Sequence, residues 1–131
     1  MEIVADASVF LSVALEGPGH QSIIDRTIGK RIVSPEVLPY EIGNALIAGK
    51  RRTRLQLTDK DIHQAYSRSQ SIPVRLVRIR IDEALKLALR WNIYAYDAYY
   101  LQCAREHGLP LLSLDGAMLK IAKTMKITLV E

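Results

Sequence analysis

The sequence predicts an α/β fold, with helices flanking a central, parallel, twisted sheet of about five short strands. Along the 131 residues, short apolar runs alternate with segments of helical spacing, the pattern of a parallel sheet covered on both faces. Two of these apolar runs end in an aspartate that leads at once into a helical segment. The chain shows no internal repeat, low-complexity tract or linker, so residues 1–131 are expected to form a single domain.

The first half of the chain is predicted to alternate strands and helices over residues 3–5, 8–16, 20–28, 31–33 and 35–48. The first helix ends at Glu16-Gly17-Pro18-Gly19 because Gly and Pro interrupt helices. Ser34-Pro35 is a favourable start for the third helix. Pro39 conflicts with that start, since a proline inside a helix removes a hydrogen bond and clashes with the preceding turn. The helix therefore either kinks at Pro39 or begins there.

The second half is predicted to contain helices at 58–71, 81–91, 97–106 and 116–124 and strands at 74–79, 111–114 and 127–130. Thr58 is a suitable N-cap. Residues 74–79 alternate apolar and basic side chains, which is the period of a strand. Asp97 opens a helix that is closed by His107-Gly108-Leu109-Pro110.

The composition and charge limit the classes of protein to which this chain can belong. With 49% hydrophobic and 24% charged residues, the chain is an ordinary globular protein. No apolar run approaches the roughly 20 residues of a membrane span, and Asp6 interrupts any export signal. The single Cys103 can form neither an internal disulfide nor, alone, a zinc site, so a cytoplasmic location is expected. The net charge of +4 favours a polyanionic partner.

Four acidic residues are predicted to meet at one edge of the sheet. Asp6 and Asp115 each follow an apolar strand, and parallel strands all end at the edge where ligands bind in open α/β sheets. Asp97 opens the helix that leads into the 111–114 strand, so it begins at that same edge. Glu41 lies on the inward stripe of its helix, where a charge is costly to bury without a partner.

Each acid also has a purely structural explanation. Asp6 and Asp97 can be N-caps, Asp115 a turn residue, and Glu41 the partner of an arginine. Together, however, four converging carboxylates repel one another, and a divalent metal removes that conflict. Mg²⁺ and Mn²⁺ prefer oxygen ligands and commonly act on phosphates. A bound metal can activate water and stabilise a leaving oxygen, as hydrolysis of a phosphodiester requires.

Four segments in this order resemble a PIN domain over the whole chain: Asp6-Ala7-Ser8, Tyr40-Glu41-Ile42-Gly43-Asn44-Ala45-Leu46, Tyr96-Asp97-Ala98-Tyr99-Tyr100-Leu101 and Ser113-Leu114-Asp115. More narrowly, the chain is similar to the VapC toxins of type II toxin–antitoxin systems, which are small PIN ribonucleases. The resemblance implies an endoribonuclease that uses Mg²⁺ or Mn²⁺ and leaves a 5′-phosphate and a 3′-hydroxyl. Its acidic centre would be Asp6, Glu41, Asp97 and Asp115. A homodimer and an antitoxin whose tail enters the pocket are also implied.

The resemblance gives roles to three further residues. Ser8 matches the family's frequent Ser or Thr after the first Asp and would hold a carboxylate or a metal-bound water. Asn44, one helical turn after Glu41, matches a polar position that lines the pocket. Ser113 stands where many members have Thr and would orient Asp115.

Basic and aromatic residues leave alternatives open. Lys50, Arg51, Arg52 and Arg54 follow the Glu41 helix, and they either grip RNA phosphates or complement the helix C-terminus. The aromatic side chains could stack bases, but their spacing favours a core or a dimer interface; they are Trp91, Tyr94, Tyr96, Tyr99 and Tyr100.

Three other functions compete. A receiver-like signalling module fits poorly, because no second acid adjoins Asp6 and no lysine follows the last strand. A PIN nuclease of RNA processing or decay that has no antitoxin is not distinguished from a toxin by the sequence. A PIN domain that only binds RNA is disfavoured by the intact set of four acids.

Overall fold

A four-stranded parallel sheet organises the computed structural model, which describes residues 1–51 and 57–131. The strand order is β3-β2-β1-β4, and every pairing is parallel. The strands are β1 (Glu2–Ala5), β2 (Arg31–Pro35), β3 (Arg75–Val77) and β4 (Leu111–Leu112). Because all four run the same way, their carboxyl ends share one edge, as the sequence predicted.

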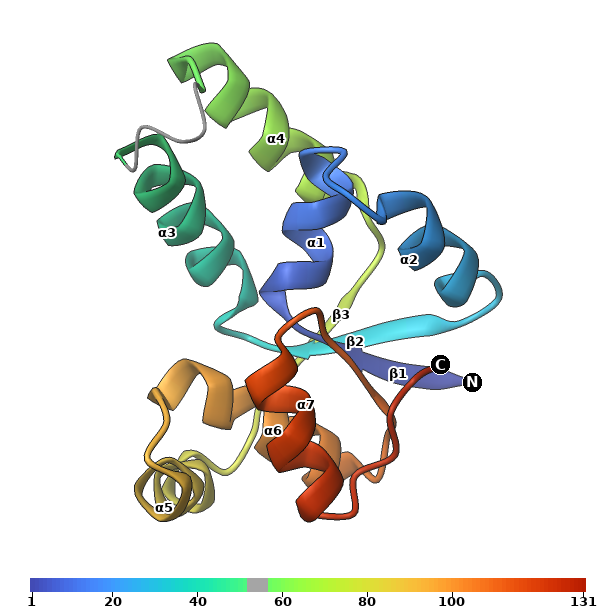
Figure 1. Cartoon of the computed structure of the whole chain (residues 1–131), viewed down its shortest axis with the longest axis vertical. Coiled ribbons are helices and arrows are strands. Elements are labelled where there is room, and N and C mark those ends of the chain that lie inside the picture. Colours follow the sequence, from blue (N-terminus) through green and yellow to red (C-terminus); the bar gives the residue numbers. More distant parts are fainter. Residues whose placement is uncertain (52–56) are drawn as a thin grey trace.

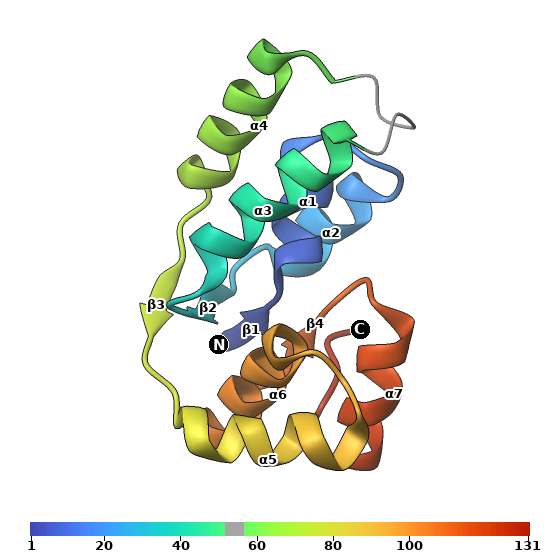
Figure 2. The same cartoon turned by 90° about the vertical axis from the view of Figure 1, so that its left-hand side faces the viewer.

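Helices cover both faces of the sheet. Helices α1 to α4 lie on one side and α5 to α7 on the other (Figures 1 and 2). Their bounds are α1 (Ala7–Ala14), α2 (His20–Thr27), α3 (Leu38–Arg51), α4 (Asp59–Ser71), α5 (Ile81–Trp91), α6 (Ala95–His107) and α7 (Gly116–Thr124). The predicted α/β class is confirmed. Within the described ranges, no helix combines the length and apolarity that crossing a membrane requires.

Strand β1 is the centre of the core. Ile3, Val4 and Ala5 are fully buried between the two helical layers, since β1 has a partner strand on each side and helices on both faces. An all-apolar run is what such a strand requires. Its last residue is followed directly by Asp6, so the most rigid element of the fold positions the first acid.

The fifth predicted strand, 127–130, is not formed. Leu129 makes a single parallel bridge to Leu111, and the Val130 amide donates to the Leu111 carbonyl at 3.0 Å. Strand β4 is only two residues long, and its pairing with residues 127–130 is confined to this one bridge. The predicted strand at 74–79 likewise shortens to Arg75–Val77.

The starts of α3 and α6 were left open or placed differently by the sequence. Helix α3 begins at Leu38, so Pro39 lies in the first turn, where amides have no intrahelical partner and proline costs no hydrogen bond. Helix α6 begins at Ala95 with Tyr94 as its N-cap. Asp97 therefore lies inside the first turn and is not the N-cap.

Candidate active site

Asp6 is the most buried acid at the carboxyl edge, with 4% of its surface exposed. The Ser8 hydroxyl donates to its Oδ1 and the Ser113 hydroxyl to its Oδ2, both at 2.5 Å. Each hydroxyl also accepts a backbone amide at 3.0 Å, Ser8 from Leu114 and Ser113 from Asp115. Asp6 thus joins the turn after β1 to the turn after β4. The Ser113 hydroxyl thus bonds both the Asp6 carboxylate and the Asp115 backbone amide, whereas the resemblance implied only that it would orient Asp115.

The two strand-end acids also cap helices. Asp6 Oδ1 accepts the Val9 amide at 3.4 Å and N-caps α1. Asp115 Oδ1 accepts the amides of Ala117 and Met118 at 3.0 and 3.2 Å and N-caps α7. Both contacts to Asp115 use Oδ1, which leaves Oδ2 outside the cap. Capping therefore fixes both carboxylates at the edge and is compatible with a second role.

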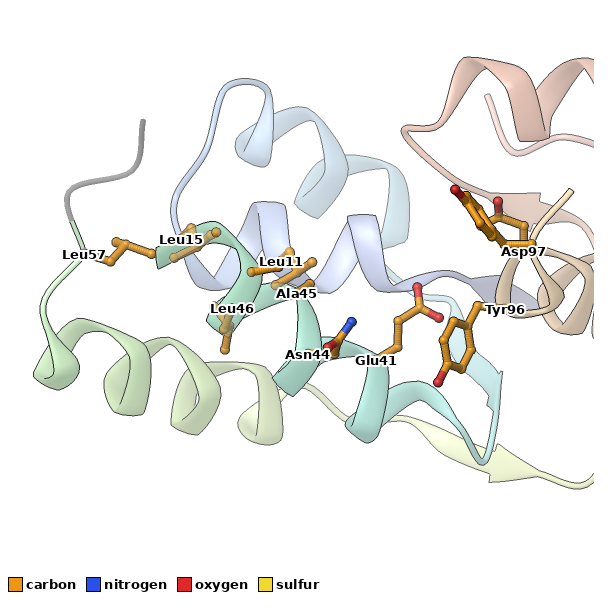
Figure 3. A pocket seen from close by; sticks show the side chains of 12 residues that line it. Leu11, Leu15, Glu41, Asn44, Ala45, Leu46, Leu57, Tyr96 and Asp97 are labelled. Atoms are coloured by element: carbon orange, nitrogen blue, oxygen red, sulfur yellow. The ribbon is translucent and has the colours of Figure 1, made fainter. Parts of the chain in front are cut away.

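Glu41 brings a carboxylate from α3 to the same edge. Its side chain extends from α3 toward the side of the groove that holds Tyr96 and Asp97 (Figure 3). The buried Oε2 has no hydrogen-bond partner among the described residues, so the structure gives no support to an arginine partner. Burial raises the Glu41 pKa to about 7, with the charges of Asp6 and Asp97 adding to the rise. Such a carboxyl exchanges its proton near neutral pH.

Asp97 is half-buried in the first turn of α6. Burial raises its pKa, and the charges of Asp115 and Asp6 raise it further. Burial also raises the Asp6 pKa, against the lowering effect of its hydrogen bonds to Ser113 and Ser8. Asp6 and Asp97 thus lie within electrostatic reach of each other and of both Glu41 and Asp115, although the four acids come from four separate segments.

The carboxylate oxygens suit a hard divalent cation, although they do not surround one completely. Across residues 1–51 and 57–131, no three Asp, Glu, His or Cys side chains form a ready-made metal-binding group. Mg²⁺ is commonly held by one or two carboxylates together with waters and substrate phosphates. A bound cation would give the buried Glu41 Oε2 a partner. It would also offset the repulsion among the acids.

Tyr100 is a residue of this site, although its spacing in the sequence favoured a dimer interface or the core. Its ring is fully buried, as expected there, and its hydroxyl lies close to Glu41 and lowers the pKa of that carboxyl. Neither this hydroxyl nor Glu41 Oε2 has a partner of ordinary hydrogen-bond geometry among the described residues. Burial and the nearby Glu41 charge raise the Tyr100 pKa, so the phenol stays protonated. Tyr100 follows Asp97 by three residues and so lies on the same face of the helix. This spacing could have predicted that Tyr100 belongs to the site.

An open groove of about 450 Å³ runs along α3 and is lined by two of the acids, Glu41 and Asp97. Glu41, Asn44 and Asp97 form its polar part, while Leu11 of α1 and Leu15, the residue that caps the end of α1, contribute apolar wall (Figure 3). Asn44 thus lines the groove, at the position where the resemblance placed a polar residue.

Tyr94 and Tyr96 also line this groove. Tyr94 is 83% exposed and Tyr96 48% exposed. The two rings therefore do not fill the core, which is one of the two places that their spacing favours; the other, a dimer interface, stays a prediction. Trp91 and Tyr99 are half-buried against the core, in keeping with the core position.

The basic residues lie beyond the far end of the groove. Ala48 and Gly49 line it, and Lys50 and Arg51 follow in the last turn of α3. Lys50 forms an ion pair with Asp59 of α4, and both cations are placed to complement the helix C-terminus. The other two candidates, Arg52 and Arg54, lie outside the described residues.

The pKa of Glu41 predicts how stability depends on pH. Its folded value of about 7 lies above the ordinary 4.5, so the folded state binds this proton more tightly than the unfolded state. The contribution to the free energy of unfolding is fully present below pH 4.5 and is lost as pH rises through about 7. Partial exposure reduces the expected loss to about 1–2 kcal/mol.

Thermal unfolding of metal-free protein across this pH range checks the prediction. We expect Glu41→Gln to flatten the profile, and Glu36→Gln, an exposed residue just before α3, to leave it unchanged. An equally steep loss in Glu41→Gln would show that other groups titrate.

Comparison with known proteins agrees with this geometry. The PIN domain family model matches residues 3–124. The crystal structure of PAE2754 from Pyrobaculum aerophilum superimposes with a TM-score of 0.61 at 24% identity, over 92% of this chain and 86% of that one; at this identity the likeness shows the fold alone. No curated protein sequence matches the chain. Because the family model spans nearly the whole sequence, the chain belongs to the PIN domain family, whose members are generally nucleases.

Proposed function

We propose that this protein is a Mg²⁺- or Mn²⁺-dependent endoribonuclease, acting as the toxin of a VapBC-type toxin–antitoxin system. The observation that carries the nuclease proposal is the convergence of four carboxylates beside an open groove, with Glu41 Oε2 buried and unpartnered among the described residues. PIN nucleases act on nucleic acid and typically use divalent metals. The toxin assignment rests on the order and spacing of the four motifs.

The residues would divide the work as follows. Asp6, Glu41, Asp97 and Asp115 would hold the metal, which when bound supplies a water of lowered pKa and positive charge at the phosphate oxygens. Ser8 and Ser113 keep Asp6 from rotating, because each oxygen of its carboxylate accepts one hydroxyl.

Helix α3 contributes Glu41 and Asn44 to the groove. In the metal-free protein Glu41 takes up a proton near neutral pH, since its pKa is about 7, so a metal held by Glu41 would compete with this proton. The exposed Asn44 amide lines the groove one turn further along the helix, where it can donate to a phosphate or sugar oxygen. The groove is open to solvent, so an RNA chain can cross the acidic edge and be cut internally.

Cleavage of a mixed tRNA and rRNA pool tests the nuclease proposal. We expect discrete fragments with Mg²⁺ or Mn²⁺, none with EDTA, and full recovery when the metal is restored, because the carboxylates alone cannot activate the water. The new ends should be 5′-phosphates and 3′-hydroxyls. Fragments that persist in EDTA would contradict the metal-dependent mechanism, and intact RNA in every metal would indicate a PIN domain that only binds RNA.

The antitoxin is tested separately. If a neighbouring gene encodes a small DNA-binding protein, that protein should form a complex with this chain, and adding it should stop cleavage. A nuclease that cleaves RNA but is not inhibited in this way would belong to RNA processing or decay instead. Sedimentation of the purified chain tests the expected homodimer in the same preparation.

A further inference from the structure

The buried hydroxyl of Tyr100 has no role in the packing of the core. Tyr100 lies in the middle of α6, and among the described residues it is the largest side chain that is fully buried. A hydroxyl in such a position normally forms a hydrogen bond, because burial without a partner costs free energy. This hydroxyl has no partner of ordinary geometry in the part of the chain that the structure describes. A phenylalanine would fill the same space without that cost.

Glu41 offers the acceptor that this hydroxyl lacks. Its Oε2 is also buried and has no hydrogen-bond partner within the described ranges. Burial raises the Glu41 pKa, and the Tyr100 hydroxyl, acting as a hydrogen-bond donor, lowers it. The two residues come from opposite helical layers, Glu41 from α3 and Tyr100 from α6 (Figures 1 and 2). A buried donor and a buried acceptor therefore approach each other at the carboxyl edge of the sheet.

The phenol can act on this carboxylate only as a donor. Burial raises the Tyr100 pKa, and the charges of Glu41 and Asp6 raise it further, so the hydroxyl keeps its proton. Tyr100 does not line the groove, so it is placed to act on Glu41 and not on a ligand in the groove. Asp6 is held in a comparable way, by two serine hydroxyls.

We propose that Tyr100 is a positioning residue for Glu41: its hydroxyl donates to the Glu41 carboxylate and fixes the orientation in which that group can hold a divalent cation. This inference rests on the proposed metal-dependent function and adds a residue to its site. An ionised carboxylate has about four lone pairs, so Glu41 can accept this hydrogen bond and still bind a cation. Carboxylates that bind a metal are usually hydrogen-bonded in turn, and these supporting partners orient the ligand.

The first test compares the affinity of the unsubstituted chain and of Tyr100→Phe for Mn²⁺, in a titration in which the EPR signal of free Mn²⁺ reports binding. The substitution removes the hydroxyl and keeps the ring, so the packing of the core is retained. Tyr66→Phe is the matched control, since Tyr66 is an exposed residue of α4 that lies outside the groove.

We expect Tyr100→Phe to bind Mn²⁺ about 10- to 100-fold more weakly than the unsubstituted chain, because removal of a group that orients a metal ligand typically has an effect of this size. Tyr66→Phe should bind Mn²⁺ as the unsubstituted chain does. Unchanged affinity in Tyr100→Phe, or an equal loss in Tyr66→Phe, would overturn the proposal.

A double-mutant cycle tests whether the hydroxyl acts through Glu41. Urea unfolding is measured in EDTA at about pH 8, above the Glu41 pKa of about 7, for the unsubstituted chain, Tyr100→Phe, Glu41→Gln and the double variant. Tyr100→Phe should lower the urea midpoint more with Glu41 intact than in the Glu41→Gln background, because residues of one hydrogen-bond network do not contribute additively. Equal shifts in the two backgrounds would overturn the proposal and would make Tyr100 a core residue only.

The two measurements separate this inference from the proposed function. If the unsubstituted chain binds no Mn²⁺ and cleaves no RNA, the metal-dependent ribonuclease is contradicted, while the cycle in EDTA still decides whether Tyr100 orients Glu41. If the unsubstituted chain binds Mn²⁺ and cleaves RNA but the cycle is additive, the proposed function stands and the positioning role of Tyr100 is overturned.

Discussion

Asp97→Asn is expected to abolish metal-dependent RNA cleavage and, at the same time, to raise the thermal stability of the metal-free protein. Loss of a residue that merely supports a metal ligand commonly costs 10- to 100-fold, so loss of a ligand itself should cost at least about 100-fold in kcat/KM. The stability gain has an electrostatic cause. Burial and the charges of Asp115 and Asp6 raise the Asp97 pKa, and a neutral amide at this position avoids both costs.

Asp82→Asn is the matched control for this experiment. Asp82 also lies in the first turn of a helix, α5, but it is exposed and is not part of the groove. Its replacement should leave cleavage unchanged and should not raise stability, because it relieves no repulsion among the four acids. Wild-type cleavage by Asp97→Asn would contradict the acidic centre, whereas lost cleavage with lowered stability would contradict the electrostatic cause.

Ser113→Ala should have the second-largest effect, on both stability and cleavage. The hydroxyl is 3% exposed; it donates to Asp6 Oδ2 and accepts the Asp115 amide. Its removal leaves a buried carboxylate oxygen and a partly buried amide without these partners, at an expected cost of about 1–3 kcal/mol in the free energy of unfolding. Asp6 also loses one of the two hydroxyl groups that orient its carboxylate, with Ser8 keeping the other, so we expect cleavage to fall by about 10- to 100-fold.

Denaturant unfolding and steady-state cleavage measure the two effects of Ser113→Ala. Ser113→Thr keeps the hydroxyl and should recover most of both. Ser71→Ala removes an exposed hydroxyl at the end of α4 that bonds the Arg68 carbonyl, and such surface changes stay within about 0.5 kcal/mol. If Ser113→Thr is as inactive as Ser113→Ala, the hydroxyl is not the group that holds Asp6.

The Asp97 and Ser113 variants therefore test two different requirements of the site, its negative charge and the orientation of Asp6. Charge at the edge is provided by acids that repel one another, so neutralising Asp97 should stabilise the fold. The orientation of the most buried acid is provided by hydroxyl groups, so deleting Ser113 should destabilise it. Opposite changes in stability with losses of cleavage in both variants would be hard to explain unless both residues belong to one active site.

The local elements were predictable from the sequence because their causes are local. Breaker residues end α1, the Thr58 capping box starts α4, and α5 spans residues 81–91 as its apolar spacing predicted. The two strand-to-helix turns at Asp6 and Asp115 could be placed at one edge, since all strands of a parallel sheet end on the same side. The fold class and the position of Asp6 and Asp115 at one edge follow from these features.

Tertiary structure alone decided which side chains meet. Ser113 reaches Asp6 across 107 residues only because β4 pairs with β1, and the Tyr100 hydroxyl lies near Glu41 only because α3 and α6 converge on the same edge of the sheet. Spacing alone did not show that Tyr94 and Tyr96 remain outside the core or that residues 127–130 make only a single bridge to β4. Periodicity specifies the face of an element that is apolar. The partners of a polar side chain depend on the relative positions of whole elements, which only the packing of the complete chain determines.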